Sequence, residues 1–206
     1  MRPSAGTPPN AAADLVPDSA IEVVLRTVDI LDRLQIPYVV GGSLASSLVG
    51  EARSTADVDL AVILRSHDVA GLVEAVSDSF FVSQAHVDEA INDCGSFNLI
   101  DLRSPYKVDV FVLGDDLLDR RQIARRQQVR VAGRQVWITS LEDQVLRKLT
   151  WFRLGGEVSE RQWRDVVSIL AIQGDRVDSD DLDETAALLG LSDLLERARD
   201  DATRWP

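Results

Sequence analysis

The sequence has few of the residue types on which several common sites depend. Cysteine occurs once in 206 residues, at Cys94, and histidine occurs only at His67 and His86. A single cysteine excludes an internal disulfide and any cysteine-based metal cluster, and we expect Cys94 to be a small buried hydrophobe. The two histidines are not spaced as metal ligands with any neighbour. Disulfide-stabilised scaffolds and cysteine-based metal clusters are therefore excluded.

Long apolar stretches are also absent. No run of 18 apolar residues occurs, so no transmembrane helix and no membrane partner are expected. The first residues combine one arginine with Pro, Gly, Ala and Asn and lack the apolar stretch of a secretory signal, so we expect a cytoplasmic protein. The apolar fraction of 45% is enough to bury a core with a helical extension.

Charge is strongly unbalanced along the chain. The net charge of −12 argues against broad, nonspecific binding of nucleic acid. Residues 120–164, however, contain eleven arginines or lysines and only four acidic residues, so this segment is about +7 and the remainder about −19. Two interpretations stay open: a local basic surface for a phosphate-bearing ligand, or a set of solvated helix faces.

The chain divides into two parts of different character. Residues 1–17 are rich in proline and small residues and read as a disordered lead-in. Residues 18–139 mix helical periodicity with short apolar strands, whereas only helices are predicted after Thr139. We therefore predict an α/β domain at 18–139 and a C-terminal helical domain at 140–206. The predicted strands are 38–40, 57–64, 80–82, 97–102 and 106–113, with two short ones near 129 and 136. The predicted helices are 18–34, 44–49, 67–77, 116–124, 141–154, 159–173, 179–189 and 191–203.

Three aspartates in predicted strands are the main candidates for chemistry. Asp57 and Asp59 lie two residues apart in DVDLAVIL, so their side chains share one face of a strand. Two carboxylates this close repel each other unless a cation neutralises them. Asp109 lies inside the apolar strand YKVDVFVL, where a charge is costly without a partner. A neighbouring strand that carries Asp57 and Asp59, with shared metal ions, would supply one.

Such a cluster predicts a magnesium or manganese site. Mg²⁺ prefers hard oxygen ligands and usually takes one or two protein carboxylates with waters and phosphates. Three carboxylates on adjacent strands suit two-metal nucleotidyl transfer, in which one metal activates the attacking oxygen and the other steadies the leaving pyrophosphate. We predict Asp57, Asp59 and Asp109 as metal ligands and catalytic residues. The alternatives are that the Asp-x-Asp pair is incidental and that Asp109 faces water on an edge strand.

A glycine pair precedes the first two aspartates. Gly41-Gly42-Ser43 joins a predicted strand to a predicted helix, and thirteen residues separate it from Asp57. Glycines let the backbone approach a phosphate, and a helix N-terminus offers free N–H groups. Ser43 can add a hydroxyl. The three residues are therefore predicted to bind nucleotide phosphates, with an ordinary turn as the alternative.

The segment GGSLASSLVGEARSTADVDL resembles the signature of the nucleotidyltransferase superfamily: a glycine turn, a short helix and an Asp-x-Asp strand. Its Arg-Ser-Thr-x-Asp-x-Asp part, residues 53–59, is similar to a small bacterial branch that includes AbiEii-type and MenT-like toxins. The resemblance covers about residues 20–200. It implies an α/β (α+β) nucleotidyltransferase-like fold, with a mixed sheet flanked by helices and followed by a helical region.

The same resemblance implies roles for further residues. That branch carries a later strand carboxylate, which matches Asp109, and a lysine followed by an aspartate in its helical half, which match Lys148 and Asp165. Lys148 would contact the triphosphate, a good task for a point-charge ammonium; the alternative is a surface lysine. Asp165 would orient the nucleotide or a basic side chain; the alternative is an ion pair within its own helix. Arg53 and Thr55 would flank the metal strand and help bind the nucleotide.

The implied activity is Mg²⁺-dependent transfer of a nucleoside monophosphate from a nucleoside triphosphate to an acceptor hydroxyl. The acceptor is RNA, protein or a small molecule, and a toxin role with an antitoxin partner is one expectation. The alternative is a non-catalytic protein of the same fold that binds or regulates. Trp151 and Trp163 are interpreted as interhelical packing residues, with a base-stacking platform as the alternative.

Overall fold

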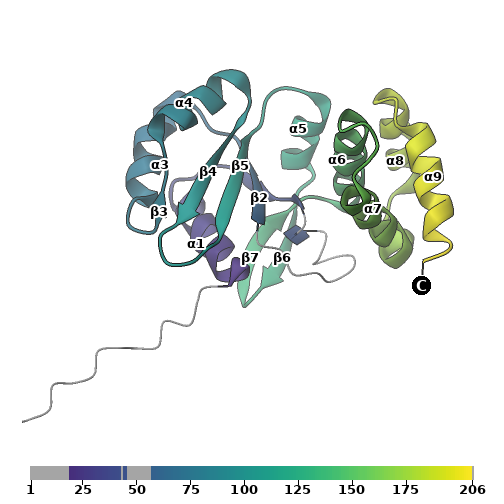
Figure 1. Ribbon diagram of the computed structural model, residues 1–206, viewed down its shortest axis with the longest axis horizontal. Coiled ribbons are helices and arrows are strands. Elements are labelled where there is room, and N and C mark those ends of the chain that lie inside the picture. Colours follow the sequence, from purple (N-terminus) through teal and green to yellow (C-terminus); the bar gives the residue numbers. More distant parts are fainter. Residues whose placement is uncertain (1–18, 43, 46–56, 206) are drawn as a thin grey trace, which may run out of the picture.

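The computed structural model describes residues 19–42, 44–45 and 57–205. A mixed sheet and its covering helices form one side of the molecule, and the last four helices form the other, with α5 between them (Figure 1). The strands are β1 (Tyr38–Val40), β2 (Asp57–Val62), β3 (Phe80–Phe81), β4 (Ser96–Asp101), β5 (Lys107–Val112), β6 (Gln127–Val131) and β7 (Arg134–Ile138). The helices are α1 (Ala20–Arg33), α3 (Val69–Val76), α4 (Gln84–Asp93), α5 (Leu117–Ala124), α6 (Leu141–Leu154), α7 (Glu160–Gln173), α8 (Ser179–Leu188) and α9 (Ser192–Ala202). Short 3₁₀ turns are η1 (Ser66–Asp68) and η2 (Gly174–Arg176).

The described strands form one sheet in the order β3-β4-β5-β2-β1-β7-β6. β2 pairs with β5 in parallel, as β1 does with β7, and the other neighbours are antiparallel. The predicted mixed sheet is therefore confirmed. β5 lies between β4 and β2, so Asp109 belongs to an interior strand, and the interpretation of Asp109 as an edge-strand residue is wrong.

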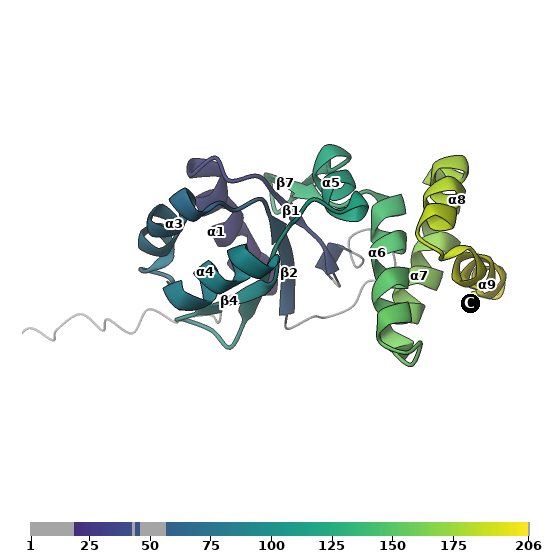
Figure 2. The same ribbon diagram turned by 90° about the horizontal axis from the view of Figure 1, so that it is seen from above.

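One face of the sheet is covered and the other carries the polar residues. Along β5 the buried positions Val108 and Val110 alternate with half-buried positions, because successive side chains point to opposite faces. The buried set packs with α1, α3 and α4, which lie together on one side of the sheet in Figure 2. Ser19 is the N-cap of α1, and its side chain and that of Glu22 form a reciprocal capping box. These helices cover one face of the sheet, and the face with the polar residues is the one where a site can form.

The buried hydrophobic residues of the described chain form two clusters. One holds the sheet with α1, α3 and α4, and the second holds α6 to α9 together with Leu118 of α5. Helix α5 is also joined to the helical part by charge: Arg121 Nε donates to Asp143 on α6 at 2.8 Å, and its Nη2 donates to Asp181 on α8 at 2.7 Å. Burial of the Asp143 carboxyl raises its pKa, although Arg121 opposes this. The proposed boundary near residue 139 therefore falls between β7 and α6, with α5 packing across it.

Two predictions about helices need comment. α4 was not predicted, because only Val87 and Ala90 are buried along it and its apolar periodicity is correspondingly weak. The sequence signal that could have found it is Ser83, whose hydroxyl caps the helix by accepting from the His86 N–H. The helix predicted at 44–49 lies largely outside the described residues. Within the described part, no helix combines the length and the apolar character needed to cross a bilayer.

Candidate functional site

Asp59 and Asp109 are direct neighbours on parallel strands. The register pairs Asp59 on β2 with Asp109 on β5, and it pairs Asp57 with Lys107 two residues earlier. Because Val58 and Val108 are buried on the covered face, both carboxylates point to the opposite, open face. The structure therefore brings together two of the three predicted metal ligands. For Asp57 it gives the strand position alone, opposite Lys107.

The Asp109 carboxylate has a close cationic partner. Lys107 Nζ lies 2.8 Å from Asp109 Oδ1 and 2.7 Å from Oδ2, so one ammonium engages both oxygens. The two residues are separated by one position on β5 and therefore share its open face. Lys107 was not among the predicted site residues. The Lys-x-Asp spacing within a predicted strand was the signal that could have found it.

Gly42 fits closely against the Asp59 side chain. The Gly41 N–H donates to the Asp59 carbonyl at 3.0 Å, which continues the β1–β2 pairing past the end of β1. Gly42 has φ of +58°, and a Cβ at this position would lie 2.6 Å from Asp59 Cβ and overlap its carboxylate. A glycine is thus required both by the backbone and by the neighbouring acid. The predicted phosphate-binding partner Ser43, together with Arg53 and Thr55, lies outside the described residues.

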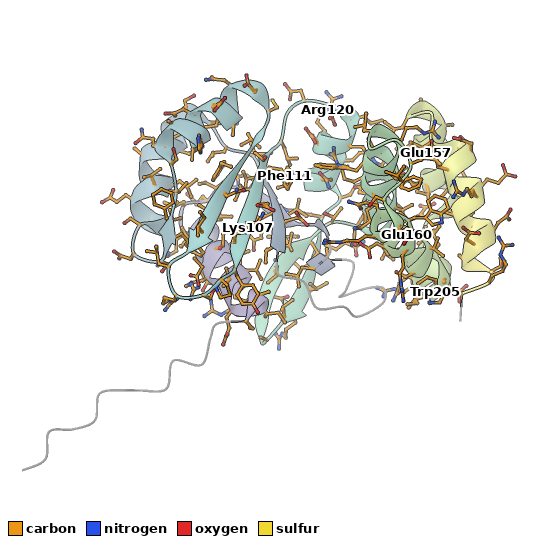
Figure 3. The ribbon with its side chains drawn as sticks, in the orientation of Figure 1. Lys107, Phe111, Arg120, Glu157, Glu160 and Trp205 are labelled. Atoms are coloured by element: carbon orange, nitrogen blue, oxygen red, sulfur yellow. The ribbon has the colours of Figure 1, made fainter. Side chains whose placement is uncertain are left out.

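A cavity of about 260 Å³ lies beside these residues and is lined from both parts of the molecule. The sheet side contributes Gly41, Gly42, Asp59 and Phe111. Helix α6 contributes a further row that includes Gln144, Arg147, Lys148 and Trp151. Figure 3 shows Phe111 and Lys107 near the two ends of β5. The open face of the sheet therefore meets α6 at the Phe111 end of this strand.

Lys148 is a buried member of the cavity wall. Its Nζ lies 2.8 Å from Asp165 Oδ2 on α7 and 3.4 Å from Gln162 Oε1. Both Lys148 and Asp165 are buried, so the interpretation of Lys148 as a surface lysine is wrong. Asp165 contacts the lysine and does not line the cavity, which is the geometry expected of a residue that orients a basic side chain.

The two tryptophans have different surroundings. Trp163 packs against Phe152 with ring centroids 5.0 Å apart, and its Nε1 donates to Asp201 at 2.9 Å, as expected for interhelical packing. Trp151 is 47% exposed, lines the cavity and meets Phe111 edge to face at 5.6 Å. The packing interpretation is confirmed for Trp163, whereas Trp151 gives the cavity an aromatic wall.

Cys94 also lies at this cavity, and the prediction that it is buried is wrong. It ends α4 in the left-handed conformation, with φ of +48°, at a surface turn beside Gly114. A residue at a helix C-terminus need not face the core even when it is apolar, because the chain leaves the helix there. The composition of the chain does not predict that Cys94 lies at an exposed helix end.

Several cations of the basic segment 120–164 are paired with acids. Arg121 reaches Asp181, and Arg153 reaches Asp193 at 2.7 Å. Both acids come from outside the segment, which explains how its local surplus of positive charge is accommodated. Within the cavity wall Arg147 binds Asp119 at 2.5 Å. Lys148, which is paired with Asp165, lines the same cavity as Gly42.

The described carboxylates at this site can be matched to the ligands that a divalent cation needs. Among the side chains that the structure describes, no three of His, Cys, Asp or Glu gather into a metal-binding group. Asp59 and Asp109 nevertheless offer two adjacent carboxylates with hard oxygens, and Mg²⁺ needs one or two from a protein. The described residues therefore fit a magnesium ion that completes its shell with water and phosphate oxygens.

No protein-family model and no curated protein matches the sequence. Solved structures do match the fold. The lincosamide antibiotic adenylyltransferase LnuA, solved with lincomycin bound, superposes with a TM-score of 0.53 at 12% identity, over 75% of this chain and 99% of its own. The chain has the nucleotidyltransferase fold. ANT(2″)-Ia in complex with adenylyl-2″-tobramycin gives a TM-score of 0.55 at 15% identity, over 82% of this chain and 95% of its own.

A third structure supports the same fold. The antigenic nucleotidyltransferase-like protein from Paracoccidioides brasiliensis gives a TM-score of 0.53 at 19% identity, over 90% of this chain and 95% of its own. At these identities the likeness is one of fold. The predicted fold class, a mixed sheet flanked by helices and followed by a helical region, is confirmed.

Proposed function

We propose that this chain is a nucleotidyltransferase that moves a nucleoside monophosphate from a nucleoside triphosphate to an acceptor hydroxyl and releases pyrophosphate. The observation that carries the proposal is the pairing of Asp59 with Asp109 on the open face of the sheet. Gly42 lies against the first carboxylate, and a cavity with a buried lysine adjoins it. Two adjacent acids are costly unless a cation binds them, so their presence points to a function.

The carboxylates would hold the divalent cation. In the proposal, Asp57, Asp59 and Asp109 bind Mg²⁺ or Mn²⁺ and are the catalytic residues. When bound, the ion would supply positive charge to the reacting phosphate and lower the pKa of the attacking hydroxyl. The protein's own part is to hold the oxygens on one rigid sheet, because strand positions are more precise than loop positions.

The remaining residues would bind the nucleotide. Gly41 and Gly42 allow the backbone to approach the phosphates, and Ser43 adds a hydroxyl. Lys148 lies on the far wall of the same cavity, where its ammonium can meet a triphosphate oxygen.

Three further residues would assist them. Asp165, at 2.8 Å from Lys148, holds the ammonium in place and is a positioning residue in this scheme. Arg53 and Thr55 would flank the metal strand and contact the nucleotide.

The acceptor and the biological setting are finer parts of the proposal. LnuA and ANT(2″)-Ia are named for antibiotics, and a small-molecule hydroxyl is accordingly one acceptor class. RNA and protein are the others, which the AbiEii-type and MenT-like resemblance favours. That branch would make the chain a cytoplasmic toxin with an antitoxin partner. Growth arrest on expression, relieved by a neighbouring gene product, would support this role, and normal growth would contradict it.

The activity is tested with purified full-length protein, Mg²⁺ and each of the four labelled nucleoside triphosphates. Label should transfer to cell-extract RNA, protein or small molecules, and calorimetry should detect nucleotide binding. Asp109→Asn should abolish transfer, whereas Arg130→Gln, an exposed change on β6, should not. Binding without transfer would favour the alternative, a non-catalytic protein of this fold. If the protein neither binds nor transfers any of the four nucleotides, both the enzyme and the non-catalytic binding protein are refuted.

A further inference from the structure

The chain has only two lysines, and both lie at the proposed site. Lys148 is explained by the nucleotide, whereas Lys107 has no role in that scheme. Lys107 is the first residue of β5, opposite Asp57 in the register, and its ammonium engages both oxygens of Asp109. Its side chain is 41% exposed, whereas that of Asp109 is 19% exposed. A metal ligand candidate is thus bound at close range by a cation of the chain itself.

We propose that Lys107 is a built-in counter-cation of the carboxylate site, which a divalent ion has to displace from Asp109. The inference rests on the proposed function, because it concerns the same metal site. Both oxygens of Asp109 accept from one ammonium, and a metal ion needs at least one of them. Metal binding therefore includes the cost of breaking this ion pair, so Lys107 lowers the affinity of the site for metal.

The chemistry of lysine suits this role. A lysine holds its charge on a flexible four-carbon stem, so the ammonium can leave Asp109 without moving the strand. Because the Lys107 side chain is partly exposed, its ammonium regains water when it is displaced, and the cost of displacement stays small. The carboxylates of Asp59 and Asp109 are thereby kept side by side at low metal concentration, and the site still accepts an ion as its concentration rises. Lys107 is a positioning residue here and not a catalytic one.

The test is Mn²⁺ binding to the full-length protein, measured by calorimetry and by the loss of the free-Mn²⁺ paramagnetic resonance signal. Lys107→Met removes the ammonium and keeps the length of the side chain. Arg130→Gln is the charge-matched control, because it removes one exposed cation on β6, at the far end of the sheet from β3. Lys107→Met should bind Mn²⁺ about fivefold more tightly than the unaltered protein, as expected for the loss of a partly exposed ion pair. Arg130→Gln should leave the affinity nearly unchanged, because salt screens a distant charge.

A second readout protects the test against a folding defect. Without added metal, Lys107→Met should melt at a lower temperature than the unaltered protein, because Asp109 loses its counter-charge. Saturating Mn²⁺ should close that gap, since the ion replaces the ammonium. Lys107→Arg, which keeps a cation able to engage both oxygens, should bind Mn²⁺ no more tightly than the unaltered protein.

The outcomes separate this inference from the proposed function. If Mn²⁺ binds the unaltered protein and Lys107→Met with equal affinity, or binds the variant more weakly, the counter-cation role is refuted and the metal site stands. If Mn²⁺ binds neither protein, the metal site of the proposed function falls, and this inference falls with it. If saturating Mn²⁺ leaves the difference in melting temperature between Lys107→Met and the unaltered protein unchanged, the ion pair of Lys107 is purely structural. That result would also refute the inference.

Discussion

Gly42→Ala is the substitution whose consequences the geometry defines most closely. Gly42 has φ of +58°, and an added Cβ would overlap the Asp59 carboxylate and lie 2.6 Å from Asp59 Cβ. The new methyl group therefore has two costs. It forces an L residue into the left-handed region, and it drives the Asp59 side chain away from its place beside Asp109.

The two costs can be given magnitudes. The left-handed conformation costs an L residue about 1–2 kcal/mol. Displacing Asp59 from its rotamer adds about 0.5–1.5 kcal/mol. We expect Gly42→Ala to lower the free energy of unfolding by about 1.5–3.5 kcal/mol. The functional loss should be larger, because a misplacement of about 1 Å at a reacting centre costs about a hundredfold in rate.

Gly190→Ala provides a matched control for the backbone cost. Gly190 has φ of +67°, and nothing lies within 4 Å of a Cβ built there. Denaturant unfolding should therefore show a loss of about 1–2 kcal/mol for Gly190→Ala and more for Gly42→Ala. Mn²⁺ binding and nucleotidyl transfer should be lost only in Gly42→Ala. Equal destabilisation by the two substitutions, with Mn²⁺ affinity kept, would refute the contact between Gly42 and Asp59.

Three further predictions follow from buried or paired groups. Lys148→Met should lower the free energy of unfolding by about 3–5 kcal/mol, because it removes the ammonium 2.8 Å from buried Asp165; Lys148→Arg should restore part of this in denaturant titrations. Asp181 has its pKa lowered by hydrogen bonds from Arg121, so its stabilisation is complete above the ordinary aspartate pKa and is lost as pH falls through the lowered pKa. Asp181→Asn should thus be about 1 kcal/mol less stable at neutral pH and nearly equal to the unaltered protein in strong acid, and a constant difference across that range would contradict the pairing. Burial raises the pKa of Tyr38 to about 12, so its stabilisation is complete below the ordinary tyrosine pKa of about 10 and is lost as pH rises through 12. In Tyr38→Phe the free energy of unfolding should depend less on pH across this alkaline range. An unchanged slope of that free energy against pH would contradict the effect of burial on Tyr38.

Local signals predicted the elements well where capping and periodicity agree. Helix α6 was predicted at 141–154 and is found there, since Ser140 caps its first turn and Gly155 follows its last residue. The strand around Asp109 was found for a similar reason, because β-branched and aromatic residues surround it. Helix α4 was missed because few of its residues are apolar at helical spacing. The success of each prediction thus depended on how much of the element's stability is local.

The arrangement of strands and helices that are distant in sequence was harder to predict. The sequence predicts that Asp109 needs a partner, but the pairing with Asp59 depends on strand order and register, which no local pattern determines. A neighbouring strand carrying Asp57 and Asp59 was one hypothesis for that partner, and the register confirms it for Asp59. The contact of Trp151 with Phe111 depends on how α6 meets the sheet, and no spacing in the sequence encodes it. Lys107 differs, because its spacing to Asp109 within one strand already places both side chains on one face.

The open face of the sheet is hard to explain by stability alone. Adjacent strands lie about 4.8 Å apart, and two like charges at about 5 Å repel by about 3 kcal/mol at an effective dielectric constant near 20. Asn or Thr at position 109 would not carry this cost. Instead the chain keeps Asp59, Asp109 and a lysine that holds the second acid. Gly42 adds a further requirement, because it leaves room for the first acid at a backbone conformation that costs other residues. The two adjacent acids and the glycine beside the first of them are costly for stability, whereas the proposed divalent-cation site would use both acids.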